Sequence, residues 1–289
     1  MEHFKSPFVP GDFGVARVVE NRRFFEETLR RAKSHRFFSH PFMSSPPTEP
    51  SREVTSFILT SFYKIVSPFT GLLCALGGRA PDLRSRFALM DNIYEEMGCG
   101  DLSAAHPSLY LKMLESIGVT QSDAENARTL PSIRRINEHL HDVVHRRSFA
   151  VACAVLASAE ATIPPSFPIL ARMAQSAFPD VDMTFFDRHG PRDDGHADDA
   201  GMLFALSADS VELDIVSAEV ESDLDFRAEL FDEWMAAIER GVPVVSQRVH
   251  GAPMPTSVSE RPPRFASERP PRIPGARRRR SPTSVPPPA

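Results

Sequence analysis

Apolar residues recur at helical spacing along most of the chain. The clearest stretch lies between residues 54 and 76, where successive apolar positions are separated by 4, 4, 3, 4, 3 and 4 residues. That is the period of an α-helix that buries one face. We expect a kink at Pro68, which lacks the N–H of a regular helix, and an end at Gly77 and Gly78. The apolar positions are Val54, Ile58, Phe62, Ile65, Phe69, Leu72 and Leu76.

The same period, interrupted by glycine and proline, predicts further helices. Segment 40–50 contains four prolines and is expected to be a loop. A loose alternation over 211–216 predicts no sheet, because an isolated strand has nothing to pair with. We therefore predict an all-α protein, a single bundle of about seven helices. Besides 54–76, the helices are expected at 20–34, 82–97, 104–117, 131–161, 168–177 and 185–206, with a last helix that ends near Arg240.

The composition changes near residue 250. Eleven of the 27 prolines lie beyond it, and the hexapeptide SERPPR occurs at 259–264 and again at 267–272. Residues 250–289 contain eight Arg and two Glu, a charge of +6, which leaves −11 for the remainder because the whole chain carries −5. Such a segment cannot bury enough apolar surface to fold. We predict three regions: an N-terminal extension with one helix (1–50), a helical domain (51–245) and a disordered Pro/Arg-rich tail (246–289).

Candidate metal ligands lie in the stretch FDRHGPRDDGHA, residues 186–197. On a helix, His189, Asp193 and His196 would fall on one stripe, at positions i, i+4 and i+7. Two imidazoles with a carboxylate suit a divalent transition metal, and non-haem Fe(II) in particular. Pro191 removes a helical hydrogen bond within the stripe, so the helix is kinked or begins there. The alternative interpretation is a solvated polar face.

Three further residues could complete a metal site. Glu96 ends one predicted helix and His106 opens the next, so the glycine turn between them could bring the two side chains together. The alternative is a surface Glu-Glu pair, which the apolar character of the helix before Glu96 argues against. Glu160 is the single charged residue of 149–161 and needs a cation if buried, either a metal or an arginine such as Arg172 or Arg188.

A competing pair lies at Glu138 and His141, spaced as Glu-x-x-His, with His145 one turn later. Ferritin-like di-iron proteins use two such pairs, and a second is not evident here. Glu160 would lie about 28 Å from His141 along one continuous helix, too far to share a site. His139, His141 and His145 are therefore interpreted as an exposed polar patch.

The combined order of these motifs resembles the haem-oxygenase-like di-iron oxidases and oxygenases, also called iron-containing redox enzymes. The resemblance covers residues 54–241 and rests on Asn-x-x-Glu-Glu-x-Gly, then Ala-His-Pro, then a helix ending in Glu, then Phe-Phe-x-x-His-x3-Asp-x2-His-Ala. It implies a seven-helix haem-oxygenase-like bundle without haem. It also implies two Fe(II) ions as cofactor, with Glu95 as the alternative first carboxylate. The implied ligands are Glu96, His106, Glu160, His189, Asp193 and His196.

The same resemblance implies an O₂-dependent oxidoreductase that acts on a small amino-acid- or fatty-acid-like substrate, in natural-product biosynthesis. N-oxygenation, oxidative C–C cleavage and desaturation are the reactions expected of such enzymes. A non-redox small-molecule-binding protein or a hydrolase on the same fold is the alternative. Aromatic residues are candidates to line the substrate pocket, although ordinary core packing is their alternative role. They are Phe62, Tyr63, Phe69, Tyr94, Tyr110 and Phe186.

Cysteine usage and the N-terminus indicate a cytoplasmic location. The three cysteines are widely separated and form no Cys-x-x-Cys pair, which argues against a thiolate zinc site. The N-terminus has no signal-peptide pattern. We expect a small-molecule substrate as partner and no membrane, with nucleic acid disfavoured. A homodimer and docking of another protein on the Pro/Arg-rich tail are further expectations.

Overall fold

The structure, a computed structural model, describes residues 15–46, 50–189, 193–209 and 213–240. The side chains of Val15, His189 and residues 193–196 lie outside this description. The chain divides into two units, Met1–Val245 and Ser246–Ala289, and every described residue belongs to the first. The regular elements of the described ranges are all helical, which confirms the predicted all-α class. The predicted disorder of the tail concerns residues outside the described ranges.

The helices follow the predicted order, with short additional helices in some of the expected loops. Two 3-10 helices, Gly98–Gly100 and Leu102–Ala104, connect the fourth α-helix to the fifth. The α-helices of the described ranges are α1 (Val15–Ala32), α2 (Pro41–Ser44), α3 (Arg52–Arg79), α4 (Leu83–Glu96), α5 (His106–Ser116), α6 (Gln121–Asn126), α7 (Pro131–Arg146), α8 (Phe149–Glu160), α9 (Ile163–Ala177), α10 (Thr184–His189), α11 (Asp193–Ser207) and α12 (Leu213–Arg240).

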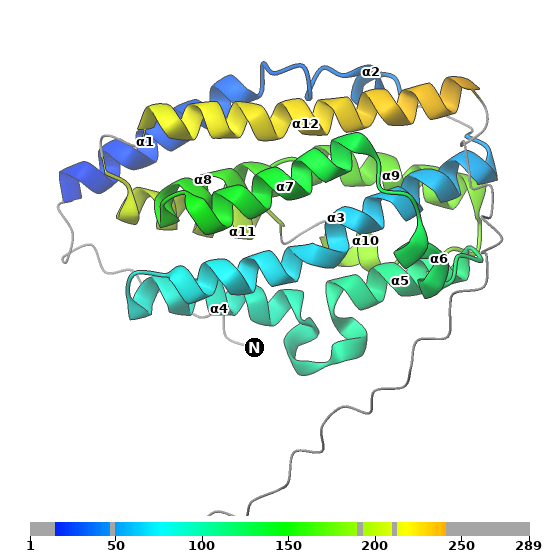
Figure 1. Ribbon diagram of the computed structural model, residues 1–289, viewed down its shortest axis with the longest axis horizontal. Helices are drawn as coiled ribbons and strands as arrows, with labels where there is room; N and C mark the ends of the chain where they lie inside the picture. The colour runs from blue at the N-terminus through cyan, green and yellow to red at the C-terminus, as the bar shows by residue number, and fades with distance from the viewer. Residues whose placement is uncertain (1–14, 47–49, 190–192, 210–212, 241–289) are drawn as a thin grey trace, which may run out of the picture. The chain divides into compact units, whose positions relative to one another are not determined.

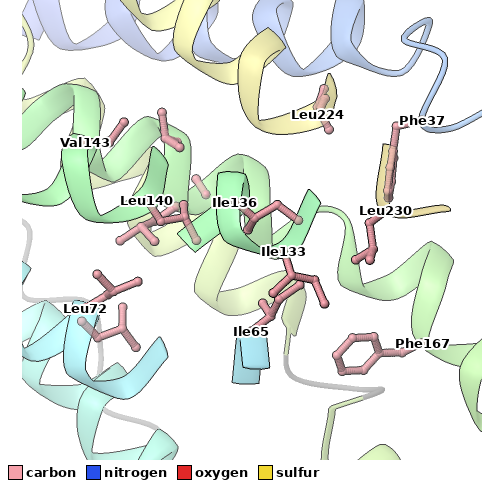
Figure 2. Packing of buried hydrophobic residues seen from close by; sticks show 14 of the residues in the cluster. Phe37, Ile65, Leu72, Ile133, Ile136, Leu140, Val143, Phe167, Leu224 and Leu230 are labelled. Carbon is pink, nitrogen blue, oxygen red and sulfur yellow. The ribbon is translucent and has the colours of Figure 1, made fainter. Parts of the chain in front are cut away.

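Helix α8 forms the centre of the bundle. Each of its twelve residues is buried, and it packs against α7, α9, α11 and α12. In Figure 1, α12, α7 and α3 lie as successive rods, with α4 and α5 beneath α3. Figure 2 shows Ile133, Ile136 and Leu140 of α7 in the core between α3 and α12. Each such buried aliphatic side chain contributes roughly 1.5–3 kcal/mol of stability.

Helix α3 continues through the two glycines that were expected to end it. Gly77 is buried, and a Cβ atom added there would lie 3.2 Å from Cδ1 of Ile93. The glycine therefore allows α4 to approach α3 closely within a regular helix. The predicted end at Gly77 and Gly78 was wrong, because a glycine can mark the close approach of two helices as well as the end of one.

Pro68 lies inside α3, as the sequence predicted. Because proline has no N–H, it leaves the carbonyl of Lys64, four residues earlier, without its helical donor. Asn137 of α7 supplies a replacement, since its Nδ2 donates to the Lys64 carbonyl at 2.9 Å. The contact satisfies a partly buried acceptor and joins α3 to α7 at the same point.

The long helix predicted over 131–161 is divided into α7 and α8. Arg147 takes an extended conformation, with φ −83° and ψ 170°, and ends α7. Ser148 begins α8 as an N-cap, because its Oγ accepts a hydrogen bond from the N–H of Val151 at 3.2 Å. Distances along a single continuous helix therefore do not apply between His141 and Glu160.

The segment before α3 is packed on the same bundle. Helix α1 contacts α11 and α12, and Nδ2 of Asn21 donates to the carbonyls of Ala205 and Ala208 at 3.0 and 2.9 Å. Phe37 and Phe42 are buried and stack on Phe231 of α12. The described part of region 1–50 thus contributes aromatic side chains to the core.

Two apolar stretches, Arg52–Arg79 and Phe149–Ala177, are long enough by length and composition to cross a membrane. In the second stretch, 78% of the most apolar window is buried inside the bundle. The core helix of a soluble protein passes the same test, so the stretches are weak support for a membrane location.

Candidate metal centre

Glu96 and His106 meet across the turn between α4 and α5. Their side chains are buried, and Oε2 of Glu96 lies 2.9 Å from Nδ1 of His106. Gly98 makes this closure achievable. Its φ is +76°, and a Cβ atom there would lie 2.5 Å from the backbone N of Ala105. Gly98 must therefore be glycine for two reasons: its backbone is left-handed, and another part of the backbone lies too close for a Cβ atom.

Glu160 lies at the end of α8 and lines the same pocket as Glu96 and His106. Its exposed fraction is 4%, so an ionised carboxylate there requires nearby positive charge or donors. Arg172 and Arg188, the arginines considered as its alternative partners, are both exposed. Between α8 and α9 the chain turns at Thr162, whose Oγ1 donates to the carbonyl of Ala159 at 2.6 Å.

The three remaining predicted ligands belong to α10 and α11. His189 is the last residue of α10, Asp193 is the first of α11, and His196 lies in the first turn of α11. Residues 190–192 and the side chains of these three residues lie outside the described part of the chain. Among the described residues, no group of three or more His, Cys, Asp or Glu is arranged to hold a metal ion.

The start of α10 is fixed to the end of α5. The N–H of Thr184 donates to Oδ1 of Asp182, whose Oδ2 lies 2.9 Å from Nζ of Lys112. Hydrogen bonds from the Thr184 side chain, from Lys112 and from the Thr184 N–H, in that order of size, lower the pKa of Asp182 from its ordinary 3.8 to about 2. One turn after this cap, Phe185 enters the pocket, with its ring 6.4 Å from that of His106.

The pocket beside Glu96, His106 and Glu160 is mainly apolar. Its cavity volume is about 80 Å³, well below the roughly 300–1,000 Å³ of a site that encloses a drug-sized ligand. Of the aromatic residues predicted to line it, Phe62 and Phe69 do so. Tyr94 was predicted wrongly, because 54% of it is exposed on the outer side of α4. Tyr110 is instead core, with its hydroxyl donating to the carbonyl of Leu59 at 2.8 Å.

Arg227 is a pocket residue that the sequence interpretation missed. It lines the pocket from α12, and its Nε donates to Oδ2 of Asp223 at 2.6 Å. Asp223 is fully buried and the Arg227 side chain is 11% exposed. A signal existed, because Asp223 and Arg227 continue the apolar spacing of Val216, Val220 and Trp234 along one face of α12.

The competing pair of Glu138 and His141, with His145 one turn later, lies on the protein surface. His141 and His145 are exposed, with stacked rings 4.0 Å apart, and Glu138 is exposed as well. His139 is half-buried, and its Nδ1 lies 3.6 Å from Oε2 of Glu219. The surface interpretation of His141 and His145 therefore holds, although the continuous-helix argument for it was wrong. The predicted exposure was wrong for His139, which is half-buried and faces α12.

Comparison with known proteins gives one family and a set of shared folds. A family model described as iron-containing redox enzyme matches residues 57–225. No curated protein sequence matches the chain.

Three solved structures illustrate the likeness. A CADD-like protein of unknown function from Nostoc punctiforme PCC 73102 has TM-score 0.61 and 15% identity, covering 79% of this chain and 100% of that one. A TenA homologue from Pseudomonas syringae pv. tomato str. DC3000 has TM-score 0.56 and 14% identity, covering 81% of this chain and 99% of that one. A domain of unknown function with a haem-oxygenase-like fold from Shewanella denitrificans OS217 has TM-score 0.55 and 18% identity, covering 78% of this chain and 94% of that one. At these identities the likeness shows a haem-oxygenase-like fold alone.

Proposed function

The chain belongs to the iron-containing redox enzyme family, and from that premise we propose that it is a non-haem di-iron oxidoreductase that uses O₂. Membership of the family supports oxidoreductase chemistry at a coarse level. The contact between Glu96 and His106, in a buried pocket that Glu160 also lines, is the observation that carries the finer proposal.

The donor set fits iron. Glu96 and Glu160 supply carboxylate oxygens and His106 an imidazole nitrogen, and imidazole with carboxylate is a ligand combination of non-haem Fe(II). In our proposal these three hold iron together with His189, Asp193 and His196 from α10 and α11. Two ferrous ions would supply electrons for the reduction of O₂. Glu96 rather than Glu95 is the proposed first carboxylate, since Glu96 lines the pocket and Glu95 is half-buried beside it.

The protein residues around this centre bind and orient the substrate. Phe62, Phe69 and Phe167 provide apolar walls that exclude water from the reacting end of the pocket. Arg227 lines the same pocket with its charge paired with that of the buried Asp223, and its guanidinium has N–H donors beyond the one used by Asp223. An arginine in an apolar wall favours a substrate with an apolar body and one carboxylate. We therefore propose a fatty-acid-like or apolar amino-acid-like substrate held by Arg227.

Iron loading and O₂ consumption test the proposed chemistry. After anaerobic reconstitution with Fe(II), wild type is expected to bind two irons per chain and to consume O₂ in the presence of substrate. Asp193→Ala and His196→Ala should lose at least one iron and turnover, because each removes a ligand. His141→Ala is the matched control, since it removes an exposed histidine outside the pocket. Full iron binding and activity in both ligand variants would refute the ligand assignment.

Binding of acids tests the role of Arg227 separately. Trp234, the single tryptophan, lies 6.0 Å from the Phe62 ring and 5.6 Å from the Phe231 ring, so its fluorescence should report occupancy of the pocket. Wild type should bind decanoic acid at least tenfold more tightly than decanol. The double variant Asp223→Asn/Arg227→Gln, which leaves no buried unpaired charge, should abolish that preference. Equal preference for the acid in wild type and variant would refute the assignment of Arg227.

A further inference from the structure

Helix α7 carries two exposed histidines one turn apart. The rings of His141 and His145 are stacked, with centroids 4.0 Å apart and planes inclined by 21°. Residues at i and i+4 are neighbours on a helix surface. The opposite face of α7 is the buried one, and Figure 2 shows Leu140 and Val143 from that face in the core. The two imidazoles therefore lie side by side on a part of α7 that does not belong to the core.

A hydrogen bond fixes which nitrogen of His145 carries the hydrogen. Nδ1 of His145 lies 2.8 Å from the carbonyl oxygen of His141. A carbonyl oxygen only accepts hydrogen bonds, so Nδ1 is the donor and Nε2 of the neutral ring has the lone pair. Histidines that bind metals are oriented in this way, with one ring nitrogen donating to a carbonyl or carboxylate while the other binds the ion. Nε2 of His145 is thus prepared to act as a metal ligand.

The spacing of the two rings fits a shared ion. Two imidazole nitrogens that bind one ion at about 2.0–2.1 Å lie about 3 Å from each other. Rings with centroids 4.0 Å apart reach this separation by small rotations about their side-chain torsions, which an exposed position permits. Among the described residues, neither ring makes a further hydrogen bond or ion pair. Binding of an ion therefore breaks no other contact of the pair.

The charges around the pair do not oppose a cation. Glu138 is exposed three residues before His141, on the same stripe of α7, and adds a negative charge there. The guanidinium of Arg146 is balanced by Asp142, since Nη1 of the arginine lies 3.0 Å from Oδ1 of the carboxylate. Arg134 is exposed on the same stripe but lies one turn beyond Glu138.

We propose that His141 and His145 together bind a divalent ion late in the first transition series, Ni²⁺, Cu²⁺ or Zn²⁺, with water as the remaining ligands. Imidazole suits these ions, and the affinity of a given site rises from Fe²⁺ through Ni²⁺ to Cu²⁺. The site shares no residue with the candidate metal centre, so this inference is independent of the proposed function. Because Fe²⁺ stands low in the order of affinity, His141→Ala remains a suitable control for iron binding.

Equilibrium dialysis of the full chain against Ni²⁺ tests the proposal. Wild type should bind one ion more per chain than His141→Ala or His145→Ala. Each variant removes one of the two linked ligands and should raise the dissociation constant of this site on the order of 100-fold. The same difference is expected in a Glu160→Ala background, because the candidate metal centre contributes no ligand. Circular dichroism should remain that of wild type, since both histidines are exposed.

A change of spacing provides the matched control. The double variant His145→Ala/Arg146→His has as many histidines as wild type, but its pair lies at i and i+5, about 140° apart around the helix. It should bind Ni²⁺ no better than His145→Ala. A wild-type chain that binds no more Ni²⁺ than His141→Ala would overturn the proposal, as would a spacing variant with the affinity of wild type.

Discussion

Gly98→Ala is expected to damage both the fold and the metal centre, because Gly98 closes the turn that brings Glu96 to His106. The residue has φ +76°, a conformation that costs a non-glycine residue about 1–2 kcal/mol. The new Cβ atom would also lie 2.5 Å from the N of Ala105 and 2.6 Å from the carbonyl carbon of Ala104. Neither atom belongs to a flexible side chain, so the backbone itself must shift.

Such overpacking adds roughly 1–3 kcal/mol. We therefore expect Gly98→Ala to lower the free energy of unfolding by about 2–5 kcal/mol in total. The shift acts directly on the residue that precedes His106, so the 2.9 Å contact between His106 and Glu96 should lengthen. Affinity for Fe(II) should fall by at least tenfold, the usual cost of disturbing the support of a metal ligand.

Gly118→Ala is the matched control. Gly118 also has a left-handed φ, +88°, but no atom lies within 4 Å of the position of its Cβ. This variant should lose only the conformational cost of about 1–2 kcal/mol and keep wild-type iron affinity. Urea denaturation gives the stability, and anaerobic Fe(II) titration gives the affinity. If Gly98→Ala lost no more stability than Gly118→Ala and bound iron normally, the proposed role of the turn would be wrong.

Three other substitutions test the contacts described above. Asp182→Asn should lower the free energy of unfolding by about 1–2 kcal/mol at pH 7. Because the native pKa of Asp182, about 2, is below the ordinary 3.8, the difference in stability from wild type should shrink as the pH falls from 4 towards 2. Urea denaturation at each pH measures it. Asn137→Ala should cost about 1–3 kcal/mol in the same assay, since it leaves the Lys64 carbonyl without its donor. Gly78→Ala, inside α3 with open space around its Cβ position, should raise the thermal midpoint through a gain of about 0.5–1 kcal/mol, and a destabilised variant would contradict the helical assignment there.

The sequence predicted most of the helices because their apolar spacing is regular and their ends carry strong local signals. Asp82 before α4 and the glycines after it are examples, since the Asp82 side chain caps the helix as expected of an N-cap residue. The approach of Glu96 to His106 was also predictable, because only a short turn separates them. A local pattern of this kind needs no knowledge of distant contacts.

Errors arose where one residue type serves two purposes. Gly77 signals the end of a helix in isolation, but here it makes room for Ile93 of α4, which only the packed fold reveals. Ser148 before an apolar run is an N-cap signal that could have divided 131–161 correctly. For α4, the apolar residues Leu83, Phe87, Met90 and Tyr94 are exposed, although Glu96 at the end of the same helix is buried.

The pocket was the least predictable part of the candidate site. Arg227 reaches it from α12, far along the chain from Glu96, and helix packing alone decides which residues of separate helices share a cavity. The spacing of Asp223 and Arg227 within an apolar face was the available sign. Of the proposed iron ligands, Glu96, His106 and Glu160 line this pocket, while the assignment of His189, Asp193 and His196 stays a prediction.

Iron stoichiometry measured in the absence of O₂ tests the central claim most directly. Mössbauer spectroscopy of protein loaded with ⁵⁷Fe(II) should detect two high-spin ferrous sites per chain in wild type, and Glu160→Ala should lose at least one of them while its circular dichroism remains that of a folded helical bundle. A wild-type chain that binds no iron, or a Glu160→Ala variant with both sites intact, would contradict the account.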